Sequence, residues 1–97
     1  MLEAQIEKYL KREIEKLGGA SIKFLSPSMV GVPDRIVVLK GRIWFVELKT
    51  ERGVVSKVQL KAQGLLLRLG LDVRTLKGIS EVKKFIEEVK TYNNEIA

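Results

Sequence analysis

The sequence predicts a single α/β domain in which a small mixed sheet packs against helices. Two β-rich runs, residues 34–39 and 42–50, flank Lys40-Gly41, a two-residue spacer typical of a tight hairpin. A helical pattern over 56–69 then leads to a strand pattern over 71–76. Strand, helix and strand over this length form a β-α-β unit, so the later strand should run parallel to the 42–50 strand through a right-handed crossover. The expected order of elements is α-β-β-β-α-β-α.

The first helix is expected over Leu2–Leu17, where apolar residues recur at helical spacing until Gly18-Gly19 ends the pattern. A short strand follows over Ala20–Leu25. The Ser26-Pro27-Ser28 loop leads towards Asp34 and is expected to form one lip of a cleft.

The second helix is expected to begin near Ser56, because Ser56-Lys57-Val58-Gln59 has the form of a capping box. Its predicted apolar face includes Leu69. Gly64 within this helix costs about 1 kcal/mol relative to alanine, which indicates close packing against a neighbour. Ser80 is expected to cap a last helix, and residues 91–97 to form a frayed polar tail after a single domain over residues 1–90.

Composition limits the chemistry that is available. Cysteine and histidine are both absent, which excludes disulfides, thiolate or histidine zinc sites, and nucleophiles paired with histidine. Catalysis would therefore use carboxylates, lysine or a metal-bound water. The chain carries 18 Lys and Arg against 12 Asp and Glu, a net charge of +6, and this balance favours nucleic acid as the partner. We expect a cytoplasmic protein without a membrane partner, since no apolar run approaches the roughly 20 residues of a span.

The hairpin register places two carboxylates opposite each other. With a two-residue loop, Ile36 faces Phe45 and Asp34 faces Glu47, while Lys49 points to the same face because side chains alternate along a strand. Each of these charged residues alone fits a turn or a solvated strand edge. Together they indicate a functional site, because Glu47 lies in a run that is apolar on both faces and a buried carboxylate needs a partner. A divalent cation such as Mg²⁺ is the expected partner.

Several motifs add up to a family resemblance. The chain contains, in order, Gly31-Val32-Pro33-Asp34-Arg35, Phe45-Val46-Glu47-Leu48-Lys49 and Ser56-Lys57-Val58-Gln59, with upstream matches at Ile6-Glu7 and Ser26-Pro27. This arrangement resembles the VRR-NUC (virus-type replication-repair nuclease) domain, a branch of the PD-(D/E)xK nucleases. The resemblance implies an αβββαβ restriction-endonuclease-like core, to which this chain adds a C-terminal helix.

The resemblance also implies roles for particular residues. Asp34 and Glu47, with the backbone carbonyl of Leu48, would hold Mg²⁺ or Mn²⁺, and Lys49 would orient the attacking water and offset charge on the phosphate. Whether Lys49 also removes a proton stays open. Glu7 and Gln59 would support the site, although Glu7 could instead pair with Lys11 at i+4, and Gln59 could only cap its helix.

The implied activity is metal-dependent hydrolysis of DNA by a viral or bacterial-host nuclease. Candidates for contacts to backbone phosphates are Arg35, Arg52, Lys57 and Lys61, which lie near the site in sequence. Because one small domain offers little surface for duplex DNA, we expect a homodimer that acts on branched DNA such as four-way junctions or flaps. The alternatives are a basic DNA-binding module whose acidic pair is structural, and a hydrolase of small phosphate compounds. The second alternative lacks a glycine-rich phosphate cradle.

Overall fold

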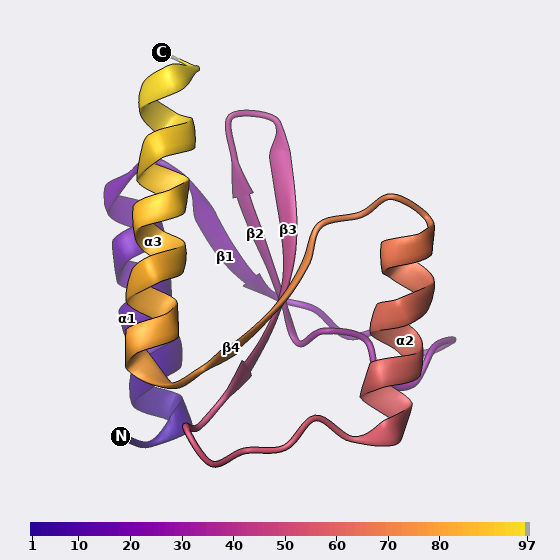
Figure 1. Ribbon diagram of the computed structural model, residues 1–97. Helices are drawn as coiled ribbons and strands as arrows, with labels where there is room; N and C mark the ends of the chain where they lie inside the picture. Colours follow the sequence, from indigo (N-terminus) through magenta and orange to yellow (C-terminus); the bar gives the residue numbers. More distant parts are fainter. Residues whose placement is uncertain (97) are drawn as a thin grey trace.

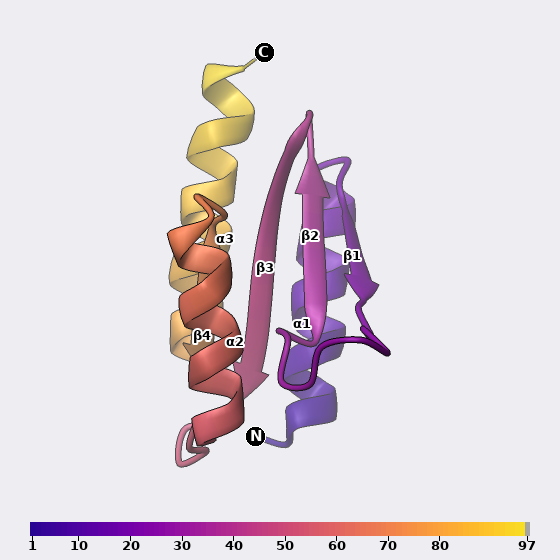
Figure 2. The same ribbon diagram turned by 90° about the vertical axis from the view of Figure 1, so that its right-hand side faces the viewer.

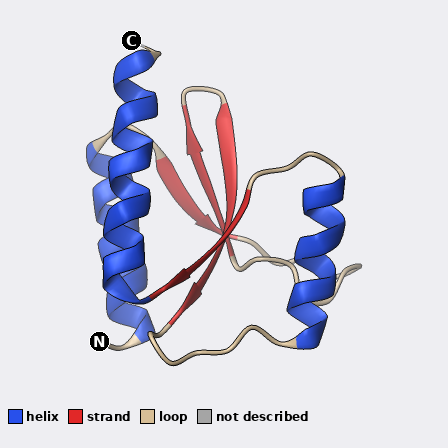
Figure 3. Ribbon diagram, in the orientation of Figure 1, coloured by secondary structure: helices blue, strands red, loops and turns tan. Residues whose placement is uncertain are grey.

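The computed structural model describes residues 1–96, and Ala97, the last residue of the expected tail, lies outside the described residues. It confirms the expected order of elements (Figure 1, Figure 3). The elements are α1 (Glu3–Lys16), β1 (Ala20–Lys23), β2 (Arg35–Leu39), β3 (Arg42–Lys49), α2 (Lys57–Arg68), β4 (Val73–Lys77) and α3 (Gly78–Glu95).

The four strands form one mixed sheet in the order β1-β2-β3-β4. β1 and β2, and β2 and β3, are antiparallel, whereas β4 runs parallel to β3, as the β-α-β pattern predicted. The hairpin register is also as predicted, since Ile36 pairs with Phe45 and Leu39 with Arg42. Lys40 and Gly41 both have positive φ angles, 46° and 81°, which is the conformation of the two-residue turn that best matches strand twist.

The sheet separates two unequal helical layers. α1 and α3 lie side by side against one face, while α2 stands on the other side of the sheet (Figure 1, Figure 2). The main core fills the α1/α3 side. It contains Ile6, Leu10, Ile14, Val37, Leu39, Trp44, Val46, Leu48, Leu76, Val82, Phe85, Ile86 and Val89.

The α2 side is less completely covered than the sequence predicted. Ile43, at the far end of β3 from Glu47, is 49% exposed, so the expectation of a strand buried on both faces holds only near Glu47. Leu69 was expected on the buried face of α2 but is exposed. A Cβ placed on Gly64 would meet only the Arg68 guanidinium, so the close neighbour that we expected for Gly64 is absent from residues 1–96. The cause is that α2 packs mainly through Ala62 and Gln63, which are buried, and leaves both flanks open.

The last helix is longer than predicted at both ends. It begins at Gly78 with Lys77 as its N-cap, so the prediction of Ser80 as the cap is wrong. It continues to Glu95, so residues 91–95 are not a frayed tail. The extension is stabilised by Tyr92, whose ring packs edge-on against Trp44 and whose hydroxyl donates to the Lys40 carbonyl at 2.9 Å. None of the helices in residues 1–96 combines the length and the apolar character that crossing a bilayer requires.

Candidate active site

Asp34 and Glu47 come together at the open end of the β2–β3 hairpin. Arg35 pairs with Val46, so the next position of the register sets Asp34 opposite Glu47. The Leu48 N–H donates to Asp34 Oδ1 at 3.4 Å. Glu47 is 4% exposed and Asp34 is half-buried. Two carboxylates therefore share one partly desolvated corner.

The environment of this pair favours its protonated forms. Burial raises the pKa of the Asp34 carboxyl above its usual value. The Leu48 N–H and the positive charge of Arg35 oppose this change, and the charges of Glu3 and Glu7 add to it. Burial also raises the pKa of Glu47, with the negative charge of Asp34 as the second cause and Lys49 opposing. The repulsion that the sequence indicated is therefore present in the fold.

Two polar side chains contact Glu47 directly. Lys49 Nζ lies 3.7 Å from Glu47 Oε2, and Gln59 Nε2 donates to the same oxygen at 3.2 Å. The amide oxygen of Gln59 meanwhile accepts from the Ser56 N–H at 2.9 Å, which completes the capping box. Gln59 thus caps α2 and contacts Glu47 with opposite ends of one amide.

A second amide extends this polar group in a way that sequence reasoning missed. Gln63, one turn after Gln59, is buried and exchanges hydrogen bonds with Thr75 at 3.1 and 3.3 Å. Thr75 is the β4 partner of Glu47 in the parallel register. The i+4 spacing of the two glutamines was the available signal, because it places both on one helix face.

The carboxylates of helix α1 are arranged differently from the expectation that Glu7 supports the site or pairs with Lys11. Glu7 forms an ion pair with Arg35 rather than with Lys11. Glu3, one turn earlier, was not singled out from the sequence, yet its charge raises the pKa of both Asp34 and Glu47. Glu3 is therefore the α1 carboxylate whose charge affects the pKa of both Asp34 and Glu47.

The four residues proposed for phosphate contacts lie in different settings. Arg35 is 5% exposed and points to the α1 side of the sheet, away from Asp34. Arg52, Lys57 and Lys61 are exposed, on the loop after β3 and along α2. No acidic residue occurs between Arg52 and Leu71, so this side of the site is uniformly basic.

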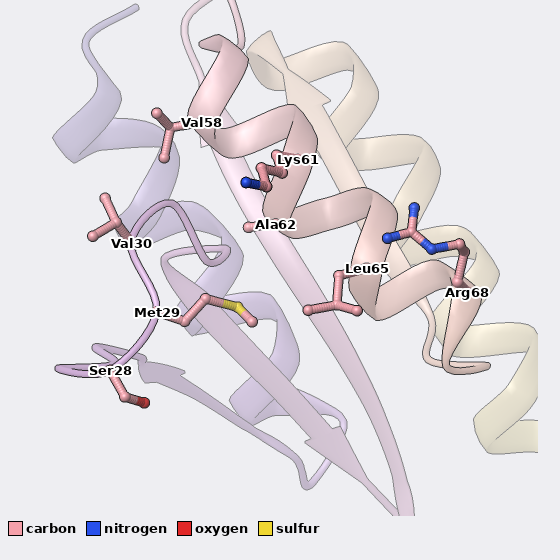
Figure 4. Close-up of a pocket in the computed structure, with 8 residues that line it drawn as sticks. All are labelled: Ser28, Met29, Val30, Val58, Lys61, Ala62, Leu65 and Arg68. Atoms are coloured by element: carbon pink, nitrogen blue, oxygen red, sulfur yellow. The ribbon is translucent and has the colours of Figure 1, made fainter.

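A cavity of about 540 Å³ lies between the loop before Asp34 and helix α2 (Figure 4). Met29 points from the loop towards Leu65 on the helix, and Lys61 and Arg68 lie along the helix side. Gly31, with φ of 86°, approaches α2 so closely that a Cβ there would lie 2.7 Å from the Val58 carbonyl oxygen. The predicted lip therefore forms one wall of a cleft.

The donors present fit a hard divalent cation. No three acidic side chains within residues 1–96 gather closely enough to form a complete cage. Mg²⁺, however, commonly takes only one or two carboxylates and fills its remaining positions with water and phosphate oxygens. The N–H and C=O of one strand residue point to the same edge. The Leu48 carbonyl therefore faces the side where its N–H meets Asp34.

Comparisons with known proteins agree with this geometry. No protein-family model matches the chain. A protein of Acyrthosiphon pisum secondary endosymbiont phage 1 named "Putative nuclease p44" is 44% identical over 75 residues, which are 76% of this chain and 81% of that protein.

Solved structures show the same fold. A structure described as a VRR_NUC domain superposes with a TM-score of 0.81 at 34% identity, covering 88% of this chain and 94% of the other. A second, described as a VRR_NUC domain protein, gives 0.68 at 18% identity over 91% and 87% of the two chains. The Holliday junction resolvase Hjc of Archaeoglobus fulgidus gives 0.56 at 18% identity over 77% and 67%, which indicates a shared fold. The chain belongs to the VRR-NUC family.

Proposed function

We propose that this chain is a nuclease of the PD-(D/E)xK type that hydrolyses DNA phosphodiesters with Mg²⁺ or Mn²⁺. The observation that carries the proposal is the convergence of Asp34, Glu47 and Lys49 at one end of the hairpin, where burial raises the pKa of both carboxyls and the charge of Asp34 raises that of Glu47 further. Folding a repulsive pair into a half-buried corner costs stability unless a cation offsets the charge. The names of the phage relative and of the VRR_NUC structures support the same activity.

The residues of the site would have different roles. Asp34, Glu47 and the Leu48 carbonyl would hold the cation, which when bound supplies Lewis-acid polarisation of the scissile phosphate and a more acidic water. Lys49, held 3.7 Å from Glu47, presents its ammonium to a phosphate oxygen or to the attacking water. Gln59 fixes the orientation of the Glu47 carboxylate through its 3.2 Å hydrogen bond.

The surroundings favour a polyanionic strand as the substrate. Arg52 lies on the loop before α2, and Lys57 and Lys61 lie on α2, where contacts to phosphates would position DNA without selecting bases. Glu3 would act on the pair through its charge from the N-terminal turn of α1. The buried Arg35 would serve this face indirectly, by holding Glu7 in an ion pair.

The test is incubation of the purified protein with linear, single-stranded, flapped and four-way-junction DNA, each with Mg²⁺, Mn²⁺ or EDTA. Cleavage that needs the cation supports the proposal. Binding that persists in EDTA without any cleavage in Mg²⁺ or Mn²⁺ would instead establish a DNA-binding module with a structural acidic pair.

We further propose that the active form is a homodimer that acts on branched DNA, with α2 at the interface. Leu60 and Leu67 are 58% and 54% exposed and lie on one flank of α2, with Gly64 between them. Because a Cβ at Gly64 would meet only Arg68 of its own helix, this flank leaves room for a second helix to approach closely. A two-fold axis along such a flank would bury the same leucines from both copies and present two centres to a symmetric junction.

Leu67→Lys should convert the dimer into a monomer, because two like charges would face each other across the axis. Light scattering at micromolar concentration measures the mass, and cleavage mapping on an immobile four-way junction shows whether nicks occur in symmetric pairs. A wild-type protein that is monomeric and cuts only at free ends would rule the dimer out.

A further inference from the structure

A pocket between α1 and β1 gathers cations on the face of the sheet opposite to the carboxylate pair. β1 runs beside α1 at that edge of the molecule (Figure 2). The pocket has a volume of about 410 Å³. Its polar lining residues are Glu7, Lys8, Lys11, Ser21, Lys23 and Arg35, which amount to four cations and one carboxylate.

Two of these cations are set directly against each other by the sheet. Lys23 of β1 pairs with Arg35 of β2, and both side chains point to the α1 side. Like charges opposite each other on neighbouring strands destabilise a sheet. Glu7 offsets the charge of Arg35, but Lys8 and Lys23 have no ion-pair partner within residues 1–96.

Two buried polar atoms in the same lining also have no partner. Ser21 is 8% exposed and Arg35 is 5% exposed, and neither Ser21 Oγ nor Arg35 Nε has a hydrogen-bond partner within residues 1–96. Buried polar groups are normally hydrogen-bonded. The Arg35 Nε–H can only donate a hydrogen bond, and the hydroxyl of Ser21 can also donate one. A ligand with hydrogen-bond acceptor atoms would therefore suit both groups.

We propose that this pocket binds a phosphate group. A phosphate would bring negative charge to a cluster in which positive charges outnumber negative ones by three. Its oxygens would also accept the hydrogen bonds that Ser21 Oγ and Arg35 Nε lack. The phosphate belongs either to the backbone of a DNA segment crossing the α1/β1 edge or to a free phosphate monoester. The site is separate from the carboxylate pair, so it does not depend on the cleavage chemistry.

The test uses the whole chain labelled with ¹⁵N, in EDTA and at constant ionic strength. Inorganic phosphate is titrated in one arm and a short duplex without terminal phosphates in the other. The proposal predicts saturable shifts of the backbone amides of Ser21 and Lys23 and of the first turns of α1. Shifts at lower concentration with duplex identify the DNA backbone as the source, and shifts with inorganic phosphate alone identify the monoester.

Three variants decide whether this pocket is where phosphate binds. Ser21→Ala, which removes only the hydroxyl, should weaken binding about tenfold, the usual loss for a hydrogen bond to a charged group. Lys11→Gln should weaken it several-fold and keeps the test valid if Ser21→Ala unfolds. Lys84→Gln removes the same charge at an exposed position of α3, outside the pocket, and should bind as the wild type does.

Two results would overturn the proposal. One is the absence of saturable shifts at Ser21 and Lys23 in both arms, as expected if only a water molecule occupies the pocket. The other is an equal loss of affinity in Lys84→Gln and Lys11→Gln, because that would show attraction to net charge without a site. Neither result bears on cleavage, which is measured separately with Mg²⁺ or Mn²⁺.

Discussion

The substitution Gln59→Glu separates the two roles of Gln59. Glutamate serves the capping box equally well, and a negative charge in the first turn of a helix is favourable by about 0.3–1 kcal/mol. If Gln59 only capped α2, the variant would therefore be as stable as the wild type or slightly more stable. The structure predicts the opposite sign, because the side-chain atom replaced by a carboxylate oxygen lies 3.2 Å from Glu47 Oε2.

The size of the effect follows from that distance. Two unit charges 3.2 Å apart repel each other by about 5 kcal/mol at an effective dielectric constant near 20 and by about 1 kcal/mol in bulk water. Glu47 is buried and residue 59 is half-exposed, so the loss at pH 7 should fall between these limits. A loss of 1 kcal/mol lowers the Tm of a domain of this size by about 4–8 °C. A repulsion near the middle of these limits, about 3 kcal/mol, less the gain of up to about 1 kcal/mol at the helix terminus, should lower the Tm by about 8 °C or more.

The assay is urea unfolding in EDTA as a function of pH. Repulsion raises the folded-state pKa of the glutamate pair, so the penalty is fully present above that raised pKa and disappears as the pH falls below 4.5, the ordinary value for Glu. Ser56→Ala is the control, because it removes the cap for about 1 kcal/mol without adding charge. A Gln59→Glu variant with wild-type stability at pH 7 would refute the contact with Glu47.

Two further predictions concern the carboxylates. Because burial and Asp34 raise the pKa of Glu47, the isosteric variant Glu47→Gln should be more stable than the wild type in EDTA at pH 7. This gain should shrink as the pH falls towards 4.5, which urea unfolding at several pH values would show. Glu7→Gln should destabilise the fold by about 1–3 kcal/mol, since it leaves the buried Arg35 without its ion pair, whereas Glu3→Gln should cost less than 0.5 kcal/mol at its exposed position. Equal losses of stability in Glu3→Gln and Glu7→Gln would contradict the claim that only Glu7 holds a buried ion pair.

Local patterns determine the hairpin and could therefore be recognised in the sequence. Lys40-Gly41 sets a two-residue turn, and the alternation of Ile36, Val38, Ile43 and Phe45 leaves one register that keeps these side chains on one face. A shift by one residue would exchange the faces, so the opposition of Asp34 and Glu47 follows from the turn. The same alternation also contained the signal that Arg35 points away from Asp34, which the motif-based assignment of Arg35 to the site overlooked.

Tertiary contacts determine the features that the sequence did not reveal. Glu3 and Glu7 lie one turn apart on α1, and only the position of the helix over the sheet shows that Glu7 pairs with Arg35 while the charge of Glu3 raises the pKa of Glu47. The extension of α3 depends on the packing of Tyr92 against Trp44, which lies nearly fifty residues earlier in the chain. The open flanks of α2 likewise depend on how far the helix stands from the sheet.

The central claim is that Glu47, as half of the carboxylate pair, is required for metal-dependent cleavage. Its most direct test is the single-turnover rate on an end-labelled four-way junction with Mg²⁺, for the wild type, for Glu47→Gln and for Glu51→Gln as an exposed glutamate outside the pair. We predict no cleavage in EDTA and wild-type rates for Glu51→Gln. For Glu47→Gln we predict a loss of at least about 100-fold, since even outer-shell partners of a metal contribute 10- to 100-fold. Cleavage by Glu47→Gln at the wild-type rate, or by the wild type in EDTA, would contradict the account.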